Sequence, residues 1–427
     1  MVYSTTSGRP GGPVGLVLTA GGARGAYQAG VLKRIGERMG HYASRSPFAI
    51  VAGASAGAIN GAAVAAYSDR FSEGTLRLAL LWSALTAEQV YRTDLRAIFG
   101  NAVRAGLDFG LGAWLGAGRV AALLDAAPLR ALLMRELPLD GIGRAIERGD
   151  LSAIAITASG YHSGISYIFV QGAPGHPVWR KSRRIVLPAE ITVDHICASA
   201  AIPLVFPPVA LSTGVRSAWF GDGAMRLTHP LSPAIRLGAE RILAIGVRCA
   251  GTAETLAERE TEPGTGEQAS MPRRPPLAQI MGVFLNAIFL DHLDADLDHL
   301  MRMNAFVKTY ESATGERPAQ SDLVEPMRVV EPLVVSPSVD LAEIADELSY
   351  RMPRTLRLAL SGLGEPDPRS ADLNSYLLFE PEYARALIDI GYHDASDRID
   401  EIEAFLMGEA PAVRPAATAI RSRSVRS

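Results

Sequence analysis

The feature that most restricts the fold of this chain is a turn at residues 53–57 with the pattern G-x-S-x-G. The apolar run 48–52 precedes it and the alanine-rich segment 58–67 follows it, which predicts a strand, a sharp turn and a helix in direct succession. Small residues on both sides of Ser55 let strand and helix approach closely, and a sharp turn lifts the serine hydroxyl off the sheet. This context favours a nucleophilic serine, although the bare pattern also recurs as a plain tight turn in a chain with 41 glycines.

A second glycine-rich turn lies upstream, at residues 20–30. Residues 14–19 predict a short buried strand before it, and apolar residues repeat at helical spacing after it as far as Met39. Backbone N–H groups converge at the start of such a helix, where negative charge is favoured. The turn lacks the P-loop pattern, and Ala20 breaks the dinucleotide-binding G-x-G-x-x-G. Beside a candidate nucleophile, the turn is therefore predicted to form an oxyanion hole and not a phosphate cradle.

A serine nucleophile needs a general base, and the strongest acidic candidate is Asp222. Apolar residues lead into it, and Gly221 and Gly223 flank it. A poorly hydrated carboxylate at a strand end has a raised proton affinity and can serve as a base, whereas Asp-Gly alone is typical of an ordinary turn. None of the eight histidines lies in a local motif that marks a triad member. His195, on a helix predicted at 192–201, is expected to pack and not to catalyse.

Taken in order, these segments resemble the patatin-like phospholipase family, as a bacterial-type patatin-like lipid acyl hydrolase. The similarity covers roughly residues 14–247, and a weaker likeness continues to Phe405. The residues that carry it are Gly21-Gly22-Ala23-Arg24-Gly25 with Gln28 and Gly30, then Gly53-Ala54-Ser55-Ala56-Gly57, then Ala198-Ser199-Ala200-Ala201-Ile202-Pro203, and finally Asp222-Gly223-Ala224.

The resemblance implies an α/β fold, a three-layer α/β/α arrangement with a largely parallel central sheet and a helical C-terminal extension. It implies hydrolysis of phospholipids or other fatty acyl esters by a Ser–Asp dyad, without a metal or cofactor. Ser55 matches the nucleophile and Asp222 the base, while Gly22, Ala23 and Arg24 match the oxyanion hole. The glycines that support these motifs are Gly21, Gly25, Gly53, Gly57 and Gly223.

Other readings remain open beside this one. The family usually has glycine where this chain has Ala20, and if that residue needs a positive φ, alanine costs about 1 kcal/mol. An acyltransferase of related fold would pass the acyl group to an acceptor other than water. An α/β-hydrolase would use a distant histidine such as His393, but its nucleophile follows several strands, whereas Ser55 follows only the second predicted one. A lipid-binding module with a decayed site is the non-enzyme alternative.

Composition restricts the partners and the compartment. A hydrophobic content of 48% with 20% charged residues excludes global disorder, and a net charge of −3 argues against nucleic acid. The first residues show no basic n-region, and no run of about 18 apolar residues exists, so neither a secretory signal nor a membrane span is expected. The chain is therefore predicted to be cytoplasmic and to meet a membrane surface peripherally. Cys197 and Cys249 have no metal or redox spacing and are expected to be buried.

Changes in composition divide the chain into five predicted parts. Residues 1–13 form a mobile arm, and residues 14–250 form the catalytic domain. Residues 251–276 are acidic and rich in Pro and Gly, which is typical of a linker or surface insertion. Residues 277–410 form a mostly helical extension with three or four helices after residue 340, and residues 411–427 form a basic disordered tail.

Two segments are candidates for membrane contact. Residues 99–115 mix glycine with large apolar residues, which is consistent with a mobile lid or with an irregular buried connection. Residues 277–306 predict one long helix whose nearly all-apolar start is expected to be a core element. In its second half His292, Asp296 and His299 share a face, which we interpret as a solvated acidic face in preference to a metal site.

Overall fold

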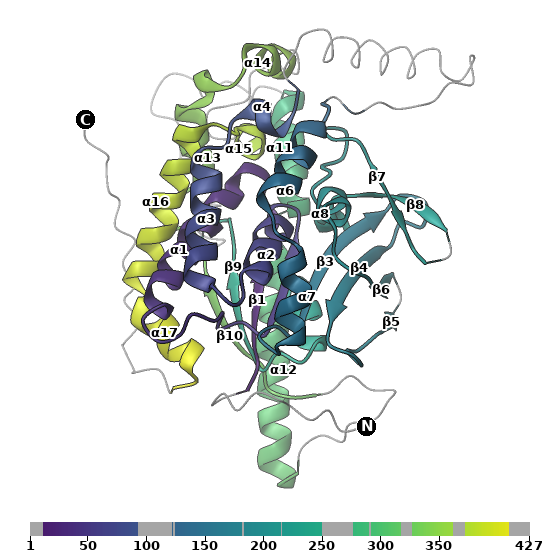
Figure 1. The fold of residues 1–427 in the computed structure, drawn as a ribbon, viewed down its shortest axis with the longest axis vertical. Helices are drawn as coiled ribbons and strands as arrows, with labels where there is room; N and C mark the ends of the chain where they lie inside the picture. The colour runs from purple at the N-terminus through teal and green to yellow at the C-terminus, as the bar shows by residue number, and fades with distance from the viewer. Residues whose placement is uncertain are drawn as a thin grey trace, which may run out of the picture.

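The computed structural model describes residues 12–92, 122, 124–181, 183–214, 216–249, 276–289, 292–316, 327–361 and 372–409. A central sheet runs through the molecule with helices on both of its faces (Figure 1). The predicted lid segment 99–115 and the tail 411–427 lie outside the described residues, as do all but the last residues of the predicted arm and linker.

The sheet is mostly parallel, which confirms the predicted fold class. In the described part of the chain it has ten strands, in the order β10-β9-β1-β2-β3-β4-β6-β5, and β8 joins β3 and carries β7. The strands from β10 to β3 pair in parallel, while β4 and β8 each pair with β3 in the antiparallel sense. The strands are β1 (Val14–Leu18), β2 (Ile50–Ala54), β3 (Ala153–Gly160), β4 (Ser166–Gly172), β5 (Arg180–Lys181), β6 (Arg184–Pro188), β7 (Val209–Ser212), β8 (Ser217–Gly221), β9 (Arg241–Ile245) and β10 (Glu331–Val335).

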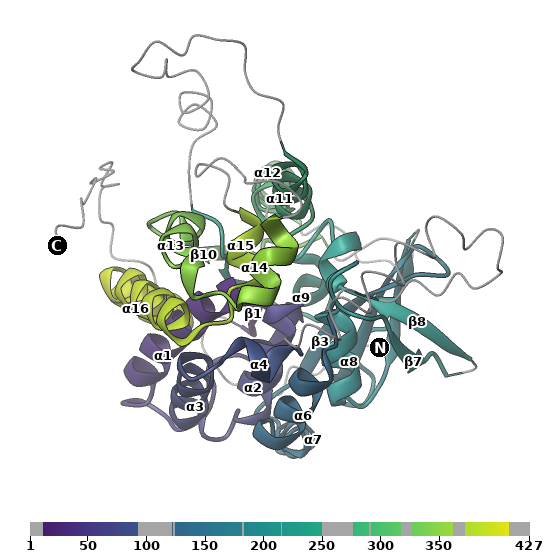
Figure 2. The ribbon, with the colours of Figure 1, turned by 90° about the horizontal axis from the view of Figure 1, so that it is seen from above.

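Alternate residues of the central strands serve two separate hydrophobic cores. Leu16 and Leu18 of β1 belong to the core on one face of the sheet, whereas Val17 belongs to the core on the other. Strands covered on both faces read as continuous apolar runs, which is why β1 and β2 contain no polar side chain. The result is the predicted three-layer arrangement, seen from above in Figure 2.

The described helices are η1 (Gly22–Arg24), α1 (Gly25–Met39), α2 (Ala56–Ala66), α3 (Phe71–Ser83), α4 (Ala87–Val90), α6 (Ala127–Glu136), α7 (Asp140–Glu147), α8 (Val193–Ser199), η2 (Gly223–Arg226), α9 (Ser232–Arg236), α11 (Leu277–Phe289), α12 (His292–Thr314), α13 (Leu341–Glu347), η3 (Ser349–Arg351), α14 (Arg354–Ser361), α15 (Asp372–Leu377), α16 (Pro381–Asp397) and α17 (Ile399–Met407). Proline or glycine marks some of the helix ends: Pro381 begins α16, and Gly408, with φ 76°, ends α17.

The C-terminal segment is built into the same body as the sheet. β10 extends the sheet beside β9, and α16 lies along α1 (Figure 1). The two helices can cross closely because glycine stands at both contact points. A side chain at Gly30 would collide with the Ile388 carbonyl, and one at Gly391 would collide with the Tyr27 carbonyl. After residue 340 the described part contains five α-helices where three or four were predicted, and Pro381 begins one of them.

The long helix predicted at 277–306 is described as two helices, α11 and α12, with residues 290–291 between them outside the description. The expectation that its start lies in the core is only half right. Leu285 and Phe289 are buried, but Ile280, Val283 and Phe284 are each more than half exposed. One apolar face packs against α15 and the other faces outward, because a helix at the periphery of a body has only one side to bury.

The prediction that Asp296 lies on a solvated face is wrong. Its side chain is 5% exposed, and Oδ2 accepts a hydrogen bond from the Leu231 N–H at 2.8 Å. Burial raises the pKa of Asp296 to about 6. Its side chain thus holds α12 against the start of α9, and among the described residues no group of three or more His, Cys, Asp and Glu is arranged to bind a metal.

None of the described helices combines the length and the apolarity needed to cross a bilayer.

Candidate active site

Ser55 sits on a strained turn between β2 and α2, as the G-x-S-x-G pattern predicts. Its backbone has φ 56° and ψ −125°. This conformation is unfavourable for any residue that has a Cβ atom, and it persists only where the surrounding structure holds the backbone in place. The glycines on either side are required by close approach: a side chain at Gly53 would collide with the Gly57 carbonyl, and one at Gly57 with the Leu18 carbonyl. The turn therefore holds the serine at the tip of the strand, 2% exposed.

Asp222 follows the last residue of β8 and caps the short helix η2. Its N–H donates to the Ala201 carbonyl at 2.9 Å, and its Oδ1 accepts from the Ala224 N–H at 2.9 Å. The side chain is fully buried, and Oδ2 has no partner with hydrogen-bond geometry among the described residues. One carboxylate oxygen is therefore held in place, while the other is available.

Burial raises the pKa of Asp222 from 3.8 to about 7, and burial outweighs the Ser55 hydroxyl and the Ala224 N–H, which both lower the pKa. The serine is close enough to act on the carboxyl's pKa, although the geometry at Oδ2 falls short of a hydrogen bond. Contacts between a nucleophile and its base are often loose without a substrate and tighten when one binds. A carboxyl with a pKa near neutrality suits proton transfer.

The glycine-rich turn at residues 20–25 lies beside the serine. Gly22 has φ 56°, lines the same pocket as Ser55, and opens η1, where the first N–H groups have no acceptor within the helix. The Arg24 N–H already donates to the Gly21 carbonyl at 3.1 Å. Ala20 is not among the residues with positive φ, so alanine carries no backbone strain there.

The C-terminal helix α15 covers this turn, a feature that sequence reasoning missed. Arg24 is 2% exposed, its Nε donates to the Ser375 hydroxyl at 2.8 Å, and its guanidinium lies 4.7 Å from the Tyr376 ring centroid. The carbonyl of Tyr376 lies against Gly22. The glycine turn is therefore buried under α15 and does not lie at the surface.

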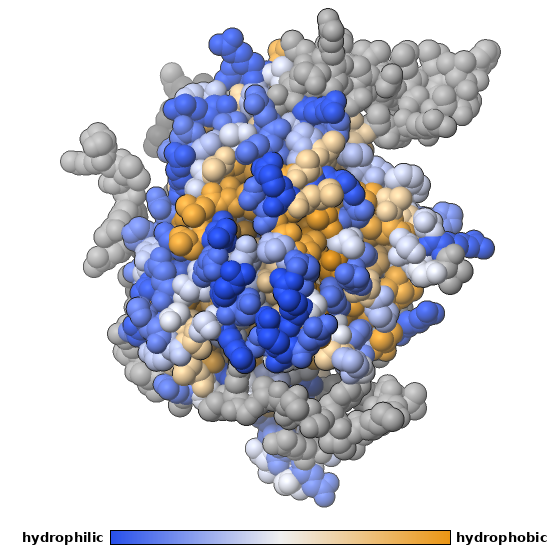
Figure 3. All heavy atoms as spheres, in the orientation of Figure 1, coloured by the Kyte–Doolittle hydropathy of each residue, from blue (hydrophilic) through white to orange (hydrophobic). Residues whose placement is uncertain are grey.

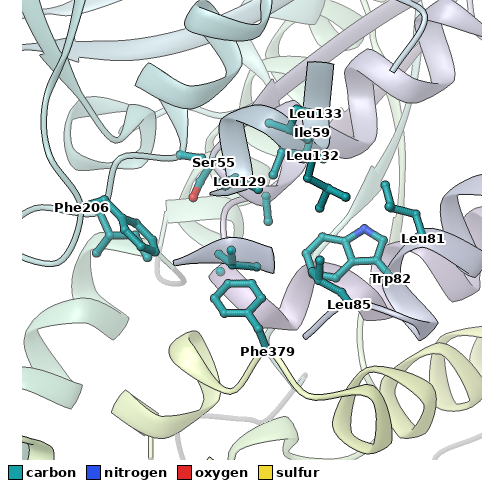
Figure 4. A pocket seen from close by; sticks show the side chains of 15 residues that line it. Ser55, Ile59, Leu81, Trp82, Leu85, Leu129, Leu132, Leu133, Phe206 and Phe379 are labelled. Carbon is teal, nitrogen blue, oxygen red and sulfur yellow. The ribbon is translucent and has the colours of Figure 1, made fainter. Parts of the chain in front are cut away.

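An apolar pocket opens beside Ser55. The serine hydroxyl faces the space between Phe206 and Phe379 (Figure 4). Trp82 donates its Nε1–H to the Asn60 side chain at 2.8 Å, so its polar atom is satisfied away from the pocket. The lining residues, apolar except for Ser55, are Gly22, Ser55, Ala56, Ile59, Leu81, Trp82, Leu85, Val90, Leu129, Leu132, Leu133, Ala200, Ile202, Phe206 and Phe379.

No histidine is among the residues that line this pocket in the described chain. The ring of His195 packs against Phe169 with centroids 4.6 Å apart, and its Nδ1 lies 2.9 Å from the Thr192 hydroxyl that caps α8. His393 is exposed on α16, with Nδ1 2.6 Å from the Asp389 carbonyl of the same helix. Both imidazoles have local structural roles.

A comparison with known families shows to which family the chain belongs. The sequence model described as "Patatin-like phospholipase" matches residues 16–235, slightly more than half of the chain. The chain belongs to the patatin-like phospholipase family. Membership implies a lipid acyl hydrolase that acts on lipid esters.

The other comparisons add little to this patatin-like assignment. No curated protein matches the chain. Among solved structures, it is similar to VipD from Legionella pneumophila at 12% identity and a TM-score of 0.30, with 90% of this chain and 69% of that chain covered. A likeness this weak carries no argument.

Ser199 supports the nucleophile turn of this patatin-like chain, and the sequence showed only that it belongs to a family block. Its hydroxyl accepts from the Ser55 N–H at 2.9 Å and donates to the Thr157 carbonyl at 2.6 Å. Ser199 is fully buried. It thus ties the strained turn to β3, close to the residues that carry Asp222.

We expect Ser199→Ala to lower the thermal midpoint and to reduce kcat for a soluble ester about tenfold. The substitution leaves the Ser55 N–H buried without a partner, which costs about 1–3 kcal/mol of stability. KM should change little, since Ser199 does not line the pocket. Ser166→Ala is the matched control, because that hydroxyl is equally buried but has no partner in the described chain. Equal kcat in the two variants would refute the role of Ser199.

Proposed function

We propose that this protein is a serine lipid acyl hydrolase, a phospholipase A or fatty acyl esterase, that uses a Ser55–Asp222 dyad. The observation that carries the proposal is the strained, buried Ser55 at the wall of an apolar pocket, beside a carboxyl whose pKa burial raises to about 7. Family membership supports the reaction class.

The chemistry proceeds in two steps. Asp222 Oδ2 takes the proton of the Ser55 hydroxyl as Oγ attacks the ester carbonyl, and the N–H groups of Gly22 and Ala23 stabilise the oxyanion. Protonated Asp222 gives this proton to the leaving alkoxide, so the alcohol departs and Asp222 is again a carboxylate. Asp222 then takes a proton from the water that attacks the acyl-serine, and it returns the proton to Ser55 Oγ as the fatty acid leaves. Arg24 contributes as a structural support of the turn, since its N–H and its side chain already have partners in this state.

The apolar lining points to hydrocarbon as the part of the substrate that enters the pocket. The walls come from α2, α3, α6 and the segment after α8, and they offer no charged side chain to a polar acid or amine. We therefore infer that the acyl chain occupies the pocket and that the polar part of the lipid stays outside.

Three assays test the proposal. A fluorophosphonate probe should label the wild type and not Ser55→Ala, which distinguishes an enzyme from a decayed lipid-binding module. Mass spectrometry of a phospholipid panel should detect free fatty acid that Ser55→Ala does not release. Transfer of the acyl group to an added alcohol, in place of free acid, would indicate an acyltransferase instead.

Activity should depend on pH through Asp222. The base must be ionised, and burial raises its pKa to about 7, so kcat/KM for a soluble ester should fall about tenfold per unit as pH decreases below 7 and level off above it. The measurement is a pH profile between about pH 5 and pH 9 with an ester that does not titrate. A flat profile across this range would contradict a buried carboxylate base.

A further inference from the structure

A second hollow adjoins the active-site pocket. It lies between α6, α8 and β7, which are neighbours in Figure 1, and its volume is about 280 Å³. Leu129, Ala200 and Phe206 line both hollows, so these side chains form the wall between them. Ser55 lines only the first. We call the second hollow the α6–β7 groove; the residues that line it are Ala126, Ala127, Leu129, Arg130, Asp194, Cys197, Ala200, Ala201, Phe206, Pro207, Pro208, Val209 and Ala210.

The chemistry of the groove suits hydrocarbon. Among the described residues that line it, only Arg130 and Asp194 are charged. They bind each other through two contacts of 2.8 and 3.3 Å and together present no net charge. Burial raises the pKa of the Cys197 thiol to about 12, so it stays neutral. Apolar cavities of roughly 150 Å³ accommodate a benzene molecule, so the groove has room for part of an alkyl chain.

An exposed tryptophan stands at the edge of the groove. Trp219 on β8 lies directly opposite Ala210 on β7, so both side chains project from the same face of this strand pair. Trp219 is 58% exposed, and an indole suits the boundary between water and lipid. Figure 3 shows further apolar side chains gathered over α3 and α6, where Leu80 and Met134 are also more than half exposed.

We propose that the α6–β7 groove binds the second acyl chain of a diacyl lipid while the other ester is at Ser55. This inference rests on the proposed function. The two esters of a diacylglycerolipid are attached to neighbouring carbons, so a lipid cleaved at Ser55 carries its second chain to the shared wall of Leu129 and Phe206. An anionic head group is a poorer occupant, because Arg130 is already paired with Asp194.

The test fills the groove and compares lipids with one and two chains. Ala210→Phe places a large side chain in the groove, from a position that is exposed and needs no rearrangement of the core. The matched control is Ser217→Phe, an exposed position on the neighbouring strand that does not line the groove. The substrates are diacyl phosphatidylcholine and lysophosphatidylcholine of equal chain length, both in detergent micelles, and p-nitrophenyl butyrate.

We expect Ala210→Phe to lose about tenfold or more of kcat/KM on the diacyl lipid, because displacing even two methylenes from an apolar site has that effect. The kcat/KM of Ala210→Phe on the lysolipid and on p-nitrophenyl butyrate should stay within about twofold of the wild-type value. Ser217→Phe should leave kcat/KM unchanged on all three substrates. Ala127→Phe fills the groove from the opposite wall and should give the same pattern, which guards against a folding defect in either variant.

The subsite would be overturned if both groove variants kept the wild-type ratio of kcat/KM between the diacyl lipid and the lysolipid. A wild type that cleaves only single-chain substrates would also overturn it. These results leave the proposed function intact. A wild type that cleaves none of the three esters would instead refute the proposed function itself. The assay thus distinguishes the two failures.

Discussion

Ser55→Ala and Asp222→Asn are each expected to reduce ester hydrolysis by about 10⁴-fold or more, and the double variant should be no worse than either. The reason is that the two groups act as one unit: without the buried carboxylate the serine keeps its proton, and without the hydroxyl the carboxylate has nothing to activate. Initial rates on p-nitrophenyl butyrate and on phospholipid micelles measure the effect.

The control for the base is Asp296→Asn. Asp296 is also a buried carboxyl, and burial raises its pKa to about 6, but it lies on α12 and binds the Leu231 N–H. We expect this variant to keep its activity. A fully active Asp222→Asn enzyme would refute the dyad, and a histidine scan that found one essential imidazole would restore the α/β-hydrolase interpretation.

Asp222→Asn should also change the stability of the folded protein, in a direction that the raised pKa of Asp222 predicts. Because burial raises the pKa of Asp222 from 3.8 to about 7, the folded state binds this proton more tightly than the unfolded state does. The resulting stabilisation is present at low pH and is lost as pH rises through about 7. Asp222→Asn should therefore have a higher thermal midpoint than the wild type at about pH 8, and the difference should shrink at about pH 5. A loss of activity with a gain of stability would separate a catalytic defect from a folding defect.

Gly22→Ala is expected to reduce turnover by about 10² to 10³, the loss typical of a displaced oxyanion donor. Gly22 has φ 56°, and a Cβ there would collide with the carbonyl oxygen of Tyr376 on α15. Either the turn or α15 must shift, and both movements carry the Gly22 N–H away from Ser55. Steady-state rates with the soluble ester, together with a thermal midpoint, measure the change.

Two controls accompany this variant. Gly143→Ala makes the same substitution on α7, where an added Cβ meets only the end of the Gln171 side chain at 3.8 Å, and should be active and stable. Ala20→Gly should also change little, since Ala20 is not among the residues with positive φ. Unchanged turnover in a folded Gly22→Ala protein would refute the assignment of the turn as the oxyanion hole.

The sequence was informative wherever the signal is local. The run from β2 through Ser55 to α2 follows from five residues between an apolar and an alanine-rich segment, and Asp222 stands at the end of its strand as predicted. A helix predicted at 192–201 is present as α8. Such features depend on backbone strain, side-chain size and periodicity over a few residues, and these are properties that a sequence displays directly.

The sequence was least informative about pairs that are distant along the chain. It predicted that Asp296 is solvated, and Asp296 is buried because Leu231, far upstream, supplies a donor. It did not assign Ser199 a partner, because the link from the Ser55 N–H to the Thr157 carbonyl joins three separate elements. Nor did periodicity show that α11 would have only one face covered.

By itself the sequence thus determined the order of strands and helices around the two glycine turns, and with it the family, the α/β class and the candidates Ser55 and Asp222. Only the tertiary structure decided what surrounds them: the burial that raises the pKa of Asp222, the cover of α15 over Gly22, and the groove beside the pocket. The physical reason is the distance along the chain over which each effect acts. Turn geometry and periodicity act between neighbours in the chain, whereas desolvation and cavity shape are set by residues that only folding brings together.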